Sequence, residues 1–297
     1  MSSSTDYDAS TPLAREIADL NRRRRAIATQ QFPLPSETRI ITVSNQKGGV
    51  GKTTTTVNLA AGLAHGGARV LVIDLDPQGN ASTALGVNHQ ADVASIYDVI
   101  VDEAPIADKV QRSPESETLW CVPATIHLAG AEIELVSLVA REQRLRTALD
   151  QYLASLDEPY HYVFIDCPPS LGLLTINAFV AAQEVLIPIQ CEYYALEGLS
   201  QLLRNIELIE RHLNPKLRVS TILLTMFDSR TNLSNQVAAD VREHFGGQVL
   251  NAVIPRSVRV SEAPSYGQSV VSYDVNSTGS LSYLEAAAEI AARGAQH

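Results

Sequence analysis

The stretch that decides the fold reads Gln46-Lys47-Gly48-Gly49-Val50-Gly51-Lys52-Thr53-Thr54. An apolar run of strand length, Ile40 to Ser44, precedes it, and a helical pattern from Thr53 to His65 follows it. Glycines let successive backbone N–H groups turn toward phosphate oxygens without Cβ clashes, and the N-terminus of the following helix adds partial positive charge. A strand, a glycine-rich turn that ends in Lys-Thr and a helix therefore predict a phosphate-binding loop. The alternative is a chance glycine-rich turn.

The two polar residues at the end of the loop carry the expected chemistry. Lys52 is expected to reach the β- and γ-phosphates of ATP, and the Thr53 hydroxyl is expected to ligate Mg²⁺. The general pattern has a leading glycine where this chain has Gln46, so the match is not literal. The residues of the loop that we expect to bind nucleotide are Lys47, Gly48, Gly49, Val50, Gly51, Lys52, Thr53 and Thr54.

Three aspartates follow predicted strands and are candidates for the metal and the attacking water. Asp74 and Asp76 end an apolar run and lead into a Pro-Gln-Gly turn. One of them can orient the water that attacks a phosphate, and the other would be structural or a Mg²⁺ group. Asp166 ends the run from Tyr162 and is expected to hold Mg²⁺ through a water. A capped strand-to-helix turn is the alternative for the first pair.

The purine contacts are the least readable part of the predicted site. In α/β nucleotide-binding folds the base tends to lie over loops that follow later strands. This points to Thr225, Met226 and Phe227 and to the segment near Pro255. Of these, Met226 and Pro255 are the expected base contacts.

From Arg39 onward, apolar runs of strand length alternate with helical patterns. Most runs are continuous and β-branched, as expected for parallel strands buried on both faces. This alternation predicts a single α/β domain with a doubly wound, mostly parallel sheet and helices on both faces. The predicted strands are Ile40–Ser44, Val70–Leu75, Leu119–Pro123, Tyr162–Asp166, Val185–Ile189, Val219–Thr225 and Val249–Ile254. The predicted helices are Thr53–His65, Glu132–Ser155, Leu171–Ala182, Ala195–His212, Leu233–Phe245 and Leu281–Arg293.

Residues 1–37 differ in composition from residues 38–297, which form the predicted nucleotide-binding domain. They are rich in Ser, Thr and Asp, carry a run of four arginines from Arg22 to Arg25, and end in a Pro-containing linker. We expect an extension that is flexible apart from one short helix, Pro12 to Ile27. An arginine run is usually a solvated surface, and contact with nucleic acid or a partner is the alternative.

The bulk composition is that of a cytosolic globular protein. The 297 residues are 45% hydrophobic, enough for one large core. The N-terminal stretch lacks the features of a secretory signal, and no apolar run is long enough to span a bilayer. Cys121, Cys167 and Cys191 lack metal-ligand spacing and are expected to be packed, reduced thiols. The net charge of −10 argues against a basic coat but permits a local phosphate-binding patch.

A second lysine, Lys47, lies near the start of the loop, where an ordinary phosphate loop needs none. With it the chain resembles the deviant Walker A ATPases, the group that holds ParA and MinD. From Arg39 to the C-terminal helix it is most similar to the ParA/Soj chromosome-partitioning family. The stretches that carry this similarity are KGGVGKTT (47–54), DLDPQGN (74–80), CEYYALEGL (191–199), LTMFDSRTN (224–232) and IPRSVRVSEAPS (254–265).

The resemblance implies an ATPase that forms a nucleotide-sandwich homodimer with ATP. Lys47 would reach the partner's phosphates and Asp76 would serve the attacking water, so Lys47, Lys52 and Asp76 are the expected catalytic residues. The ATP dimer would bind double-stranded DNA without sequence preference, through positions that match Arg230 and Arg259. A ParB-like centromere-binding protein, together with DNA, would stimulate slow hydrolysis, and the protein would be cytoplasmic and associated with the nucleoid.

Two departures from the ParA pattern could reduce the positive surface. Ser257 stands where the family more often has Asn, and Gln268 stands where a basic residue is common.

Other functions of the same ATPase group remain open from the sequence. A MinD-like division-site ATPase would end in a basic amphipathic helix, whereas the tail from Leu281 is Ala-rich with two Glu and one Arg, so no membrane binding is expected. An iron–sulfur relative would need cysteines placed to bridge a cluster, and the spacing gives no such pair. A nucleotide-gated scaffold with little hydrolysis is the third alternative, and the intact Lys52 and Asp76 favour a working ATPase.

Overall fold

An eight-stranded sheet forms the centre of the part of the chain that this computed structural model describes, residues 11–193 and 195–294. Across the sheet the strand order is β3-β4-β2-β5-β1-β6-β7-β8, and neighbouring strands are parallel except β3 with β4. The predicted mostly parallel, doubly wound sheet is confirmed. The strands are β1 (Arg39–Val43), β2 (Val70–Asp74), β3 (Gln111–Arg112), β4 (Leu119–Val122), β5 (Tyr162–Asp166), β6 (Glu184–Gln190), β7 (Arg218–Phe227) and β8 (Val249–Pro255).

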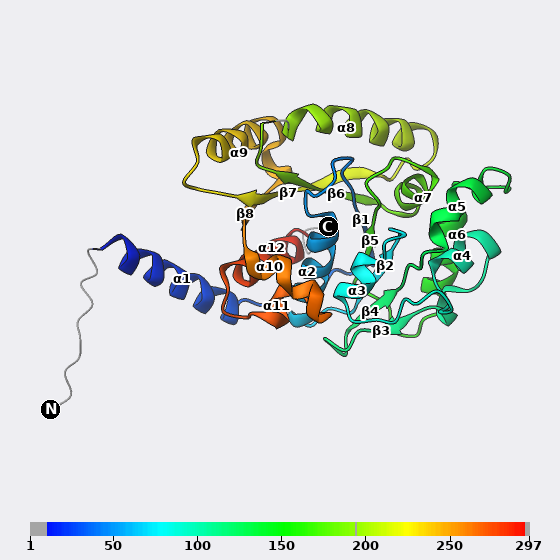
Figure 1. The fold of residues 1–297 in the computed structure, drawn as a ribbon, viewed down its shortest axis with the longest axis horizontal. Helices are drawn as coiled ribbons and strands as arrows, with labels where there is room; N and C mark the ends of the chain where they lie inside the picture. The colour runs from blue at the N-terminus through cyan, green and yellow to red at the C-terminus, as the bar shows by residue number, and fades with distance from the viewer. Residues whose placement is uncertain (1–10, 194, 295–297) are drawn as a thin grey trace.

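Helices cover both faces of the sheet (Figure 1). Helices α4 to α9 pack on one face, and α2, α3 and α10 to α12 pack on the other. Within the described ranges no helix is long and apolar enough to cross a bilayer. The helices are α1 (Pro12–Thr29), α2 (Lys52–His65), α3 (Asn80–Ala84), α4 (Ile96–Asp102), α5 (Leu128–Leu135), α6 (Arg144–Ala154), α7 (Leu173–Ala181), α8 (Ala195–His212), α9 (Asn232–Phe245), α10 (Val258–Glu262), α11 (Val270–Tyr273) and α12 (Thr278–Gly294), with short 3₁₀ helices at Ile106–Asp108, Gly246–Gln248 and Ala263–Tyr266.

Side chains alternate along the strands between two hydrophobic cores. In β1, Ile40 packs on the side of α4 to α9, and Ile41 packs on the side of α2 and α12. In β5 the same alternation places Val163 in the first core and Phe164 in the second. Because both faces are covered, most residues of the central strands are apolar, which made the strands recognisable as apolar runs.

The two helices nearest to the centre of the second core, α2 and α12, lie in close contact. A Cβ added at Gly62 of α2 would stand 3.0 Å from the Cβ of Ala287 in α12. A larger residue at position 62 would crowd Ala287 and force α2 and α12 slightly apart. The glycine therefore allows α12 to fix α2, the helix that follows the predicted phosphate-binding loop.

The single helix predicted over Glu132–Ser155 is wrong, because a turn divides this segment into α5 and α6. Ala140, in the turn, has φ of 52°, a left-handed conformation that a helix cannot contain. Asn177 of α7 holds the break. Its Nδ2 donates to the carbonyl of Arg141 at 2.8 Å, and its Oδ1 accepts from the N–H of Leu145 at 3.2 Å. The helix pattern of the segment gave no sign of this tertiary contact.

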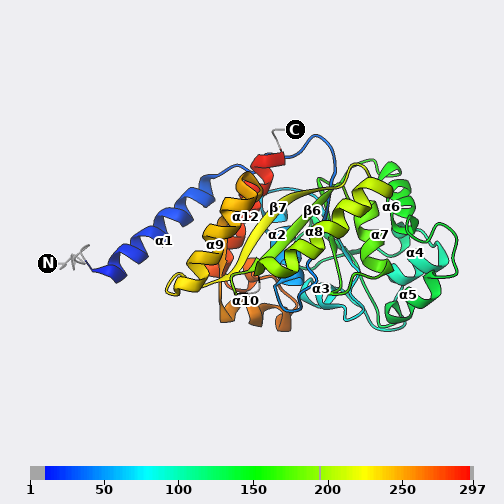
Figure 2. The ribbon, with the colours of Figure 1, turned by 90° about the horizontal axis from the view of Figure 1, so that it is seen from above.

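Helix α1 lies where a short helix was predicted in the N-terminal extension. Thr11 caps it by accepting the N–H of Ala14 at 3.2 Å, and Pro12 occupies the first turn, where a missing N–H costs nothing. The helix extends from the body beside α12 (Figure 2). The flexibility expected at residues 1–10 falls outside the described residues, and the domain boundary near residue 37 stays a prediction.

Arg39 and Glu184 form a buried ion pair that joins β1, β6 and α12. Arg39 donates through Nε and Nη2 to the two Glu184 carboxylate oxygens at 2.8 and 2.9 Å, and through Nη1 to the carbonyl of Ile290 at 2.8 Å. The two side chains are only 14% and 5% exposed. Burial acts to raise the pKa of Glu184, but the hydrogen bonds and charge of Arg39, together with Ser220 and Arg218, outweigh it and lower that pKa.

We expect Arg39→Met to lower the free energy of unfolding by about 3–5 kcal/mol, because it leaves the Glu184 carboxylate buried without its partner. The double variant with Glu184→Leu should regain most of that loss, since no buried charge remains. Chemical denaturation of the wild type and both variants measures the two effects. A loss of only about 1 kcal/mol in the single variant, typical of a surface pair, would contradict this account.

Candidate functional site

The predicted phosphate-binding loop follows β1, the strand between β5 and β6, and opens α2. Gly49 and Gly51 adopt φ of 74° and 90°, conformations that favour glycine. A Cβ added at Gly48 or Gly49 would meet no atom within 4 Å, so there is open space beside both residues. The loop lies at the carboxyl end of the parallel strands, where ligands bind in folds of this kind.

Lys52 is a buried cation within the loop. Its residue is 6% exposed, and its Nζ donates to the carbonyl of Lys47 at 3.3 Å. Burial lowers the pKa of Lys52, while the nearby Asp166 and Asp76 act to raise it. An ammonium group held against the loop backbone in this way is placed to meet an anionic group that enters the loop.

Two threonine hydroxyls of α2 hold the Asp166 carboxylate at the end of β5. Thr53 Oγ1 donates to Oδ2 at 2.7 Å, and Thr56 Oγ1 donates to Oδ1 at 2.9 Å. Burial and the charge of Asp74 raise the pKa of Asp166 to about 8, and the hydroxyl hydrogen bonds oppose that rise. A hydroxyl and a carboxylate in contact are oxygen donors of the kind that Mg²⁺ takes, so these residues fit that ion.

Asp74 is a structural group in this geometry. It is fully buried, and its Oδ2 accepts from both the N–H and the hydroxyl of Ser82, at 2.8 and 2.7 Å. Its Oδ1 accepts from the N–H of Asp76 at 3.1 Å. Burial raises the pKa of Asp74 to about 6, against these hydrogen bonds. These contacts support the structural role for Asp74, in which it positions Asp76 and α3, and its role as a Mg²⁺ group stays a prediction.

Asp76 lies half buried at the mouth of the loop. Its Oδ1 accepts the N–H of Gln78 at 3.0 Å, which fixes the turn that follows β2. Asp76 also lies near enough to Lys52 to raise the pKa of that lysine. The structure therefore brings Lys52, Asp76 and Asp166 together, as the sequence predicted.

Lys47 takes part in a contact that the sequence did not indicate. Its Nζ lies 3.2 Å from Oε2 of Glu192, and the side chains are 39% and 45% exposed. Arg256 approaches the same carboxylate at 3.7 Å. Glu192 follows β6, so only the adjacency of β6 and β1 in the sheet brings it to the loop.

Within the region predicted to contact the base, Thr225 instead holds the phosphate-binding loop by a hydrogen bond. It is buried, and its Oγ1 donates to the carbonyl of Val50 at 2.9 Å. Met226 follows with φ of 50°, and Phe227 pairs in register with Pro255 at the ends of β7 and β8. Met226 and Pro255 thus lie at the same edge of the sheet as the loop, and their contact with a base stays a prediction.

The two arginines expected to bind DNA lie outside the loop and hold surface ion pairs. Arg230, 87% exposed in its side chain, contacts Asp228 at 2.9 Å. Arg259 of α10 contacts Glu262 at 3.1 Å and Asp274 at 3.3 Å. Both side chains remain accessible to a ligand, and their role in binding DNA stays a prediction.

Two supporting residues were missed from the sequence. Thr56, three residues after Thr53 on α2, completes the clamp on Asp166, and its spacing on the helix could have revealed it. Asn45 accepts the N–H of Lys47 at 3.0 Å and donates to the carbonyl of Pro188 at 2.8 Å, which ties the loop to β6. A lone Asn before a glycine-rich turn carries no such signal.

Comparison with known proteins identifies the family. Residues 38–219 match a family model described as an AAA domain. The sporulation initiation inhibitor protein Soj of Bacillus subtilis is 54% identical over 86% of this chain and 99% of its own length. The chromosome partitioning protein ParA of Caulobacter vibrioides is 52% identical over 86% of this chain and 94% of its own length. This chain belongs to the ParA/Soj family of chromosome-partitioning ATPases.

A solved structure supports the fold assignment. It is from Mycobacterium smegmatis, is named as a cobyrinic acid a,c-diamide synthase, and contains ADP and magnesium. It matches with a TM-score of 0.68 and 39% identity, over 78% of this chain and 93% of that chain. The ParA/Soj relatives are more similar in sequence and cover more of this chain, so the assignment rests on them.

The three cysteines are buried thiols, as predicted. Cys167 follows Asp166 directly, and its Sγ lies 3.0 Å from the hydroxyl of Thr42. Burial raises the pKa of Cys167 to about 12 and that of Cys191 to about 11, and it raises the pKa of Cys121 as well.

At pH 8 these thiols should therefore be protonated and inaccessible. We expect Ellman's reagent to titrate fewer than about one thiol per native chain, and all three cysteines in denaturant. A single fast-reacting thiol in the native ParA/Soj fold would show that one of the three sites is open to solvent.

Proposed function

We propose that this chain is a Mg²⁺-dependent ATPase that acts as a dimerisation switch on DNA in the segregation of a chromosome or plasmid. The chain is a monomer without nucleotide and a sandwich homodimer with ATP. The ATP dimer binds double-stranded DNA without sequence preference. The observation that carries the proposal is the buried Lys52 near the Thr53–Asp166 hydrogen bond at the phosphate-binding loop. Membership of the ParA/Soj family supports the cellular role.

The loop would hold ATP by its phosphates. The backbone of Gly48 to Gly51 and the N-terminus of α2 offer N–H groups and partial positive charge, and Lys52 adds a full charge. Thr53 and Asp166 would hold Mg²⁺, which neutralises charge on the phosphates during transfer. A cation here would also offset the repulsion between Asp166 and Asp74, which are paired in register on adjacent strands.

Asp76 would orient the attacking water. Its turn is fixed by Asp74 and by its own bond to Gln78, so the carboxylate is held at the loop mouth. A single positioned carboxylate is a modest catalyst, and the rate then depends on how well the rest of the site is ordered. We therefore expect slow hydrolysis that a ParB-like partner and DNA stimulate, in the cytoplasm at the nucleoid.

Lys47 would exchange its partner when the dimer forms. The Lys47–Glu192 ion pair is about two-fifths exposed, and a pair of that kind contributes only about 0–1 kcal/mol. A phosphate of the nucleotide in the second subunit is a stronger partner for an ammonium group. The lysine can therefore leave Glu192 at little cost and act across the interface.

A MinD-like role at a membrane is not favoured by the C-terminal helix. Along α12 the residues Leu281, Tyr283, Leu284 and Ile290 are buried against the body of the protein. A membrane-binding helix would instead present its apolar face to lipid.

Binding to non-specific duplex DNA is the first test, by co-sedimentation or gel shift with ATP, ADP or no nucleotide across a salt titration. We expect binding only with ATP, falling steeply as salt rises. Lys52→Ala should lose nucleotide binding and with it DNA binding. Asp76→Ala should stay on DNA with ATP, while hydrolysis falls by about 100-fold or more. Absence of binding under every condition would contradict the proposal and favour a relative that binds lipid or an iron cluster.

The DNA-contact residues have a separate test. Arg259→Glu should preserve the ATP dimer, measured by light scattering, and weaken DNA binding. If each protomer then neutralises one phosphate fewer, the salt slope of the dimer falls by about 2. Arg211→Glu on α8 is the matched control, because Arg211 is also exposed and pairs with a glutamate of its own helix. Normal DNA retention by Arg259→Glu would contradict the assigned surface.

A further inference from the structure

Helix α1 is a basic element on an acidic protein. Its sequence holds five arginines against Glu16 and Asp19, a net charge of +3, whereas the whole chain carries −10. The nucleotide site does not involve it, and the proposed DNA contacts Arg230 and Arg259 lie on other elements. The positive charge of this helix is therefore not explained by the nucleotide site or by these two arginines.

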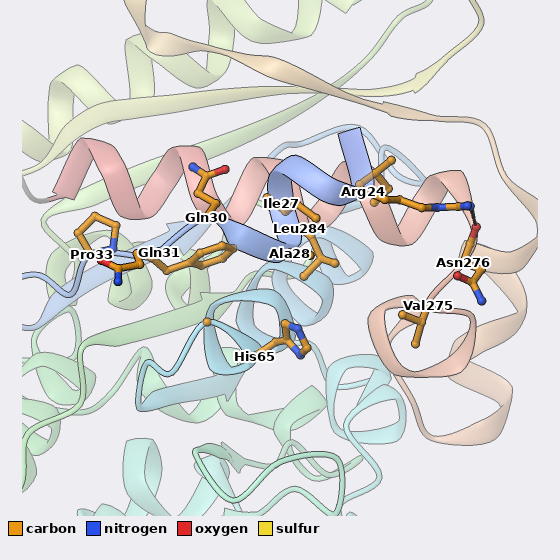
Figure 3. Close-up of a pocket in the computed structure, with 13 residues that line it drawn as sticks. Arg24, Ile27, Ala28, Gln30, Gln31, Pro33, His65, Val275, Asn276 and Leu284 are labelled. Atoms are coloured by element: carbon orange, nitrogen blue, oxygen red, sulfur yellow. Dashed lines mark hydrogen bonds between the residues drawn. The ribbon is translucent and has the colours of Figure 1, made fainter. Parts of the chain in front are cut away.

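Two of the arginines attach α1 to the body. Arg23 donates to both carboxylate oxygens of Glu285 in α12, at 2.8 and 2.6 Å. Arg24 donates to the backbone carbonyl of Asn276, and Figure 3 shows its side chain directed at that residue. Ile27 and Phe32 pack against the core that contains α2 and α12. The end of α1 is thus docked by charge and by apolar contact.

The other three arginines face solvent. Arg15, Arg22 and Arg25 are exposed, and at 100° per residue they fall within about 80° of one another, opposite to Ile27. We name these three residues the α1 stripe. It extends over about 15 Å of helix. Ala18, an exposed residue between Arg15 and Arg22 on this face, is small and does not obstruct it.

The acidic groups near the stripe neutralise only part of it. Asp19 contacts Arg22, and its side chain is 45% exposed. Glu285 is occupied by Arg23 on the opposite side of the helix. No ion pair among the described residues engages Arg15 or Arg25, so at least two charges of the stripe are available to a ligand.

The docking places α1 next to the proposed DNA surface. Arg24 is bonded to Asn276, and two residues earlier Asp274 accepts Arg259 at 3.3 Å. The segment between α11 and α12 therefore contacts both the basic helix and the arginine expected to bind DNA. In Figure 1, α1 projects from the same end of the molecule as α10 and α11.

We propose that the α1 stripe is a second contact for the phosphate backbone of duplex DNA, separate from the surface around Arg259, because Arg24, which adjoins that surface, lies on another side of α1. This inference rests on the proposed function and adds an element to its DNA interface. Arginine forks suit phosphate oxygens, and a row of about 15 Å can reach two or three phosphates along a duplex. Because backbone contacts carry no sequence information, the stripe strengthens binding without adding preference.

A membrane surface is the competing partner for a basic helix. Helices that bind lipid set large apolar residues opposite to their charges, free to enter the bilayer. Here that position is taken by Ile27, which is packed against the protein. Ile17, half exposed, lies opposite to Arg15 and Arg22, but this one side chain is too little apolar surface for stable insertion. The geometry favours DNA.

The test compares two triple variants in the full chain with ATP. One variant carries Arg15→Gln, Arg22→Gln and Arg25→Gln. The control carries Arg146→Gln, Arg204→Gln and Arg211→Gln on α6 and α8, with the same change in net charge. We expect the stripe variant to bind duplex DNA roughly tenfold more weakly near 0.15 M salt, with the salt slope reduced by about 0.9 for each phosphate that is no longer neutralised. The control should bind as the wild type does.

ATP-dependent DNA binding by the wild type is measured first, and its absence would reject the proposed function rather than the α1 stripe. Equal DNA binding by the two triple variants would overturn the inference. The inference would also be overturned if the stripe variant lost binding to phosphatidylglycerol vesicles while its DNA binding stayed intact. That result would assign the helix to a membrane. Arg→Lys at the same three positions should keep most of the salt slope, because the charges remain. ATP-dependent dimerisation and melting temperature should match in all variants.

Discussion

The hydrogen bonds from Thr53 and Thr56 to the Asp166 carboxylate are the interaction on which the site depends. They link the first turn of α2 to the end of β5, and so they fix the phosphate-binding loop against the sheet. The carboxylate is fully buried beside Asp74, and an isolated charge there would be strongly unfavourable. The two hydroxyls and the nearby Lys52 make the position tolerable. These groups lie at the loop to which the proposed function assigns the phosphates and the metal ion.

Much of the fold could be predicted because its signals are local. Strands buried on both faces appear in the sequence as apolar runs. The glycine-rich sequence of the phosphate-binding loop is rare in other structures. The break between α5 and α6 could not be predicted, because Asn177 creates it from a distant helix. The Lys47–Glu192 pair was hidden for the same reason, since only the strand order brings the two together. Site residues could therefore be predicted where they lie close together in the sequence. They could not be predicted where the sheet brings distant segments together.

The charged side chains are distributed unevenly over the molecule. A chain with a net charge of −10 would repel DNA if its charges were spread evenly. Here many acidic groups are either buried, as Asp74 and Asp166 are, or paired with arginines, as Glu285 and Asp274 are. Near α1, basic side chains then outnumber the acidic ones. The acidic remainder limits non-specific attraction elsewhere and favours one orientation on a polyanion.

The contact between Phe32 and Gly66 joins the N-terminal linker to the end of α2. A Cβ at Gly66 would overlap the Phe32 ring at 2.3 Å, so the ring rests directly on the backbone at the end of α2. The other end of α2 is Lys52 in the phosphate-binding loop. A helix of 14 residues is a stiff rod of about 21 Å, and a tilt at one end displaces the other. The phosphate-binding loop and the N-terminal linker thus contact opposite ends of the same helix.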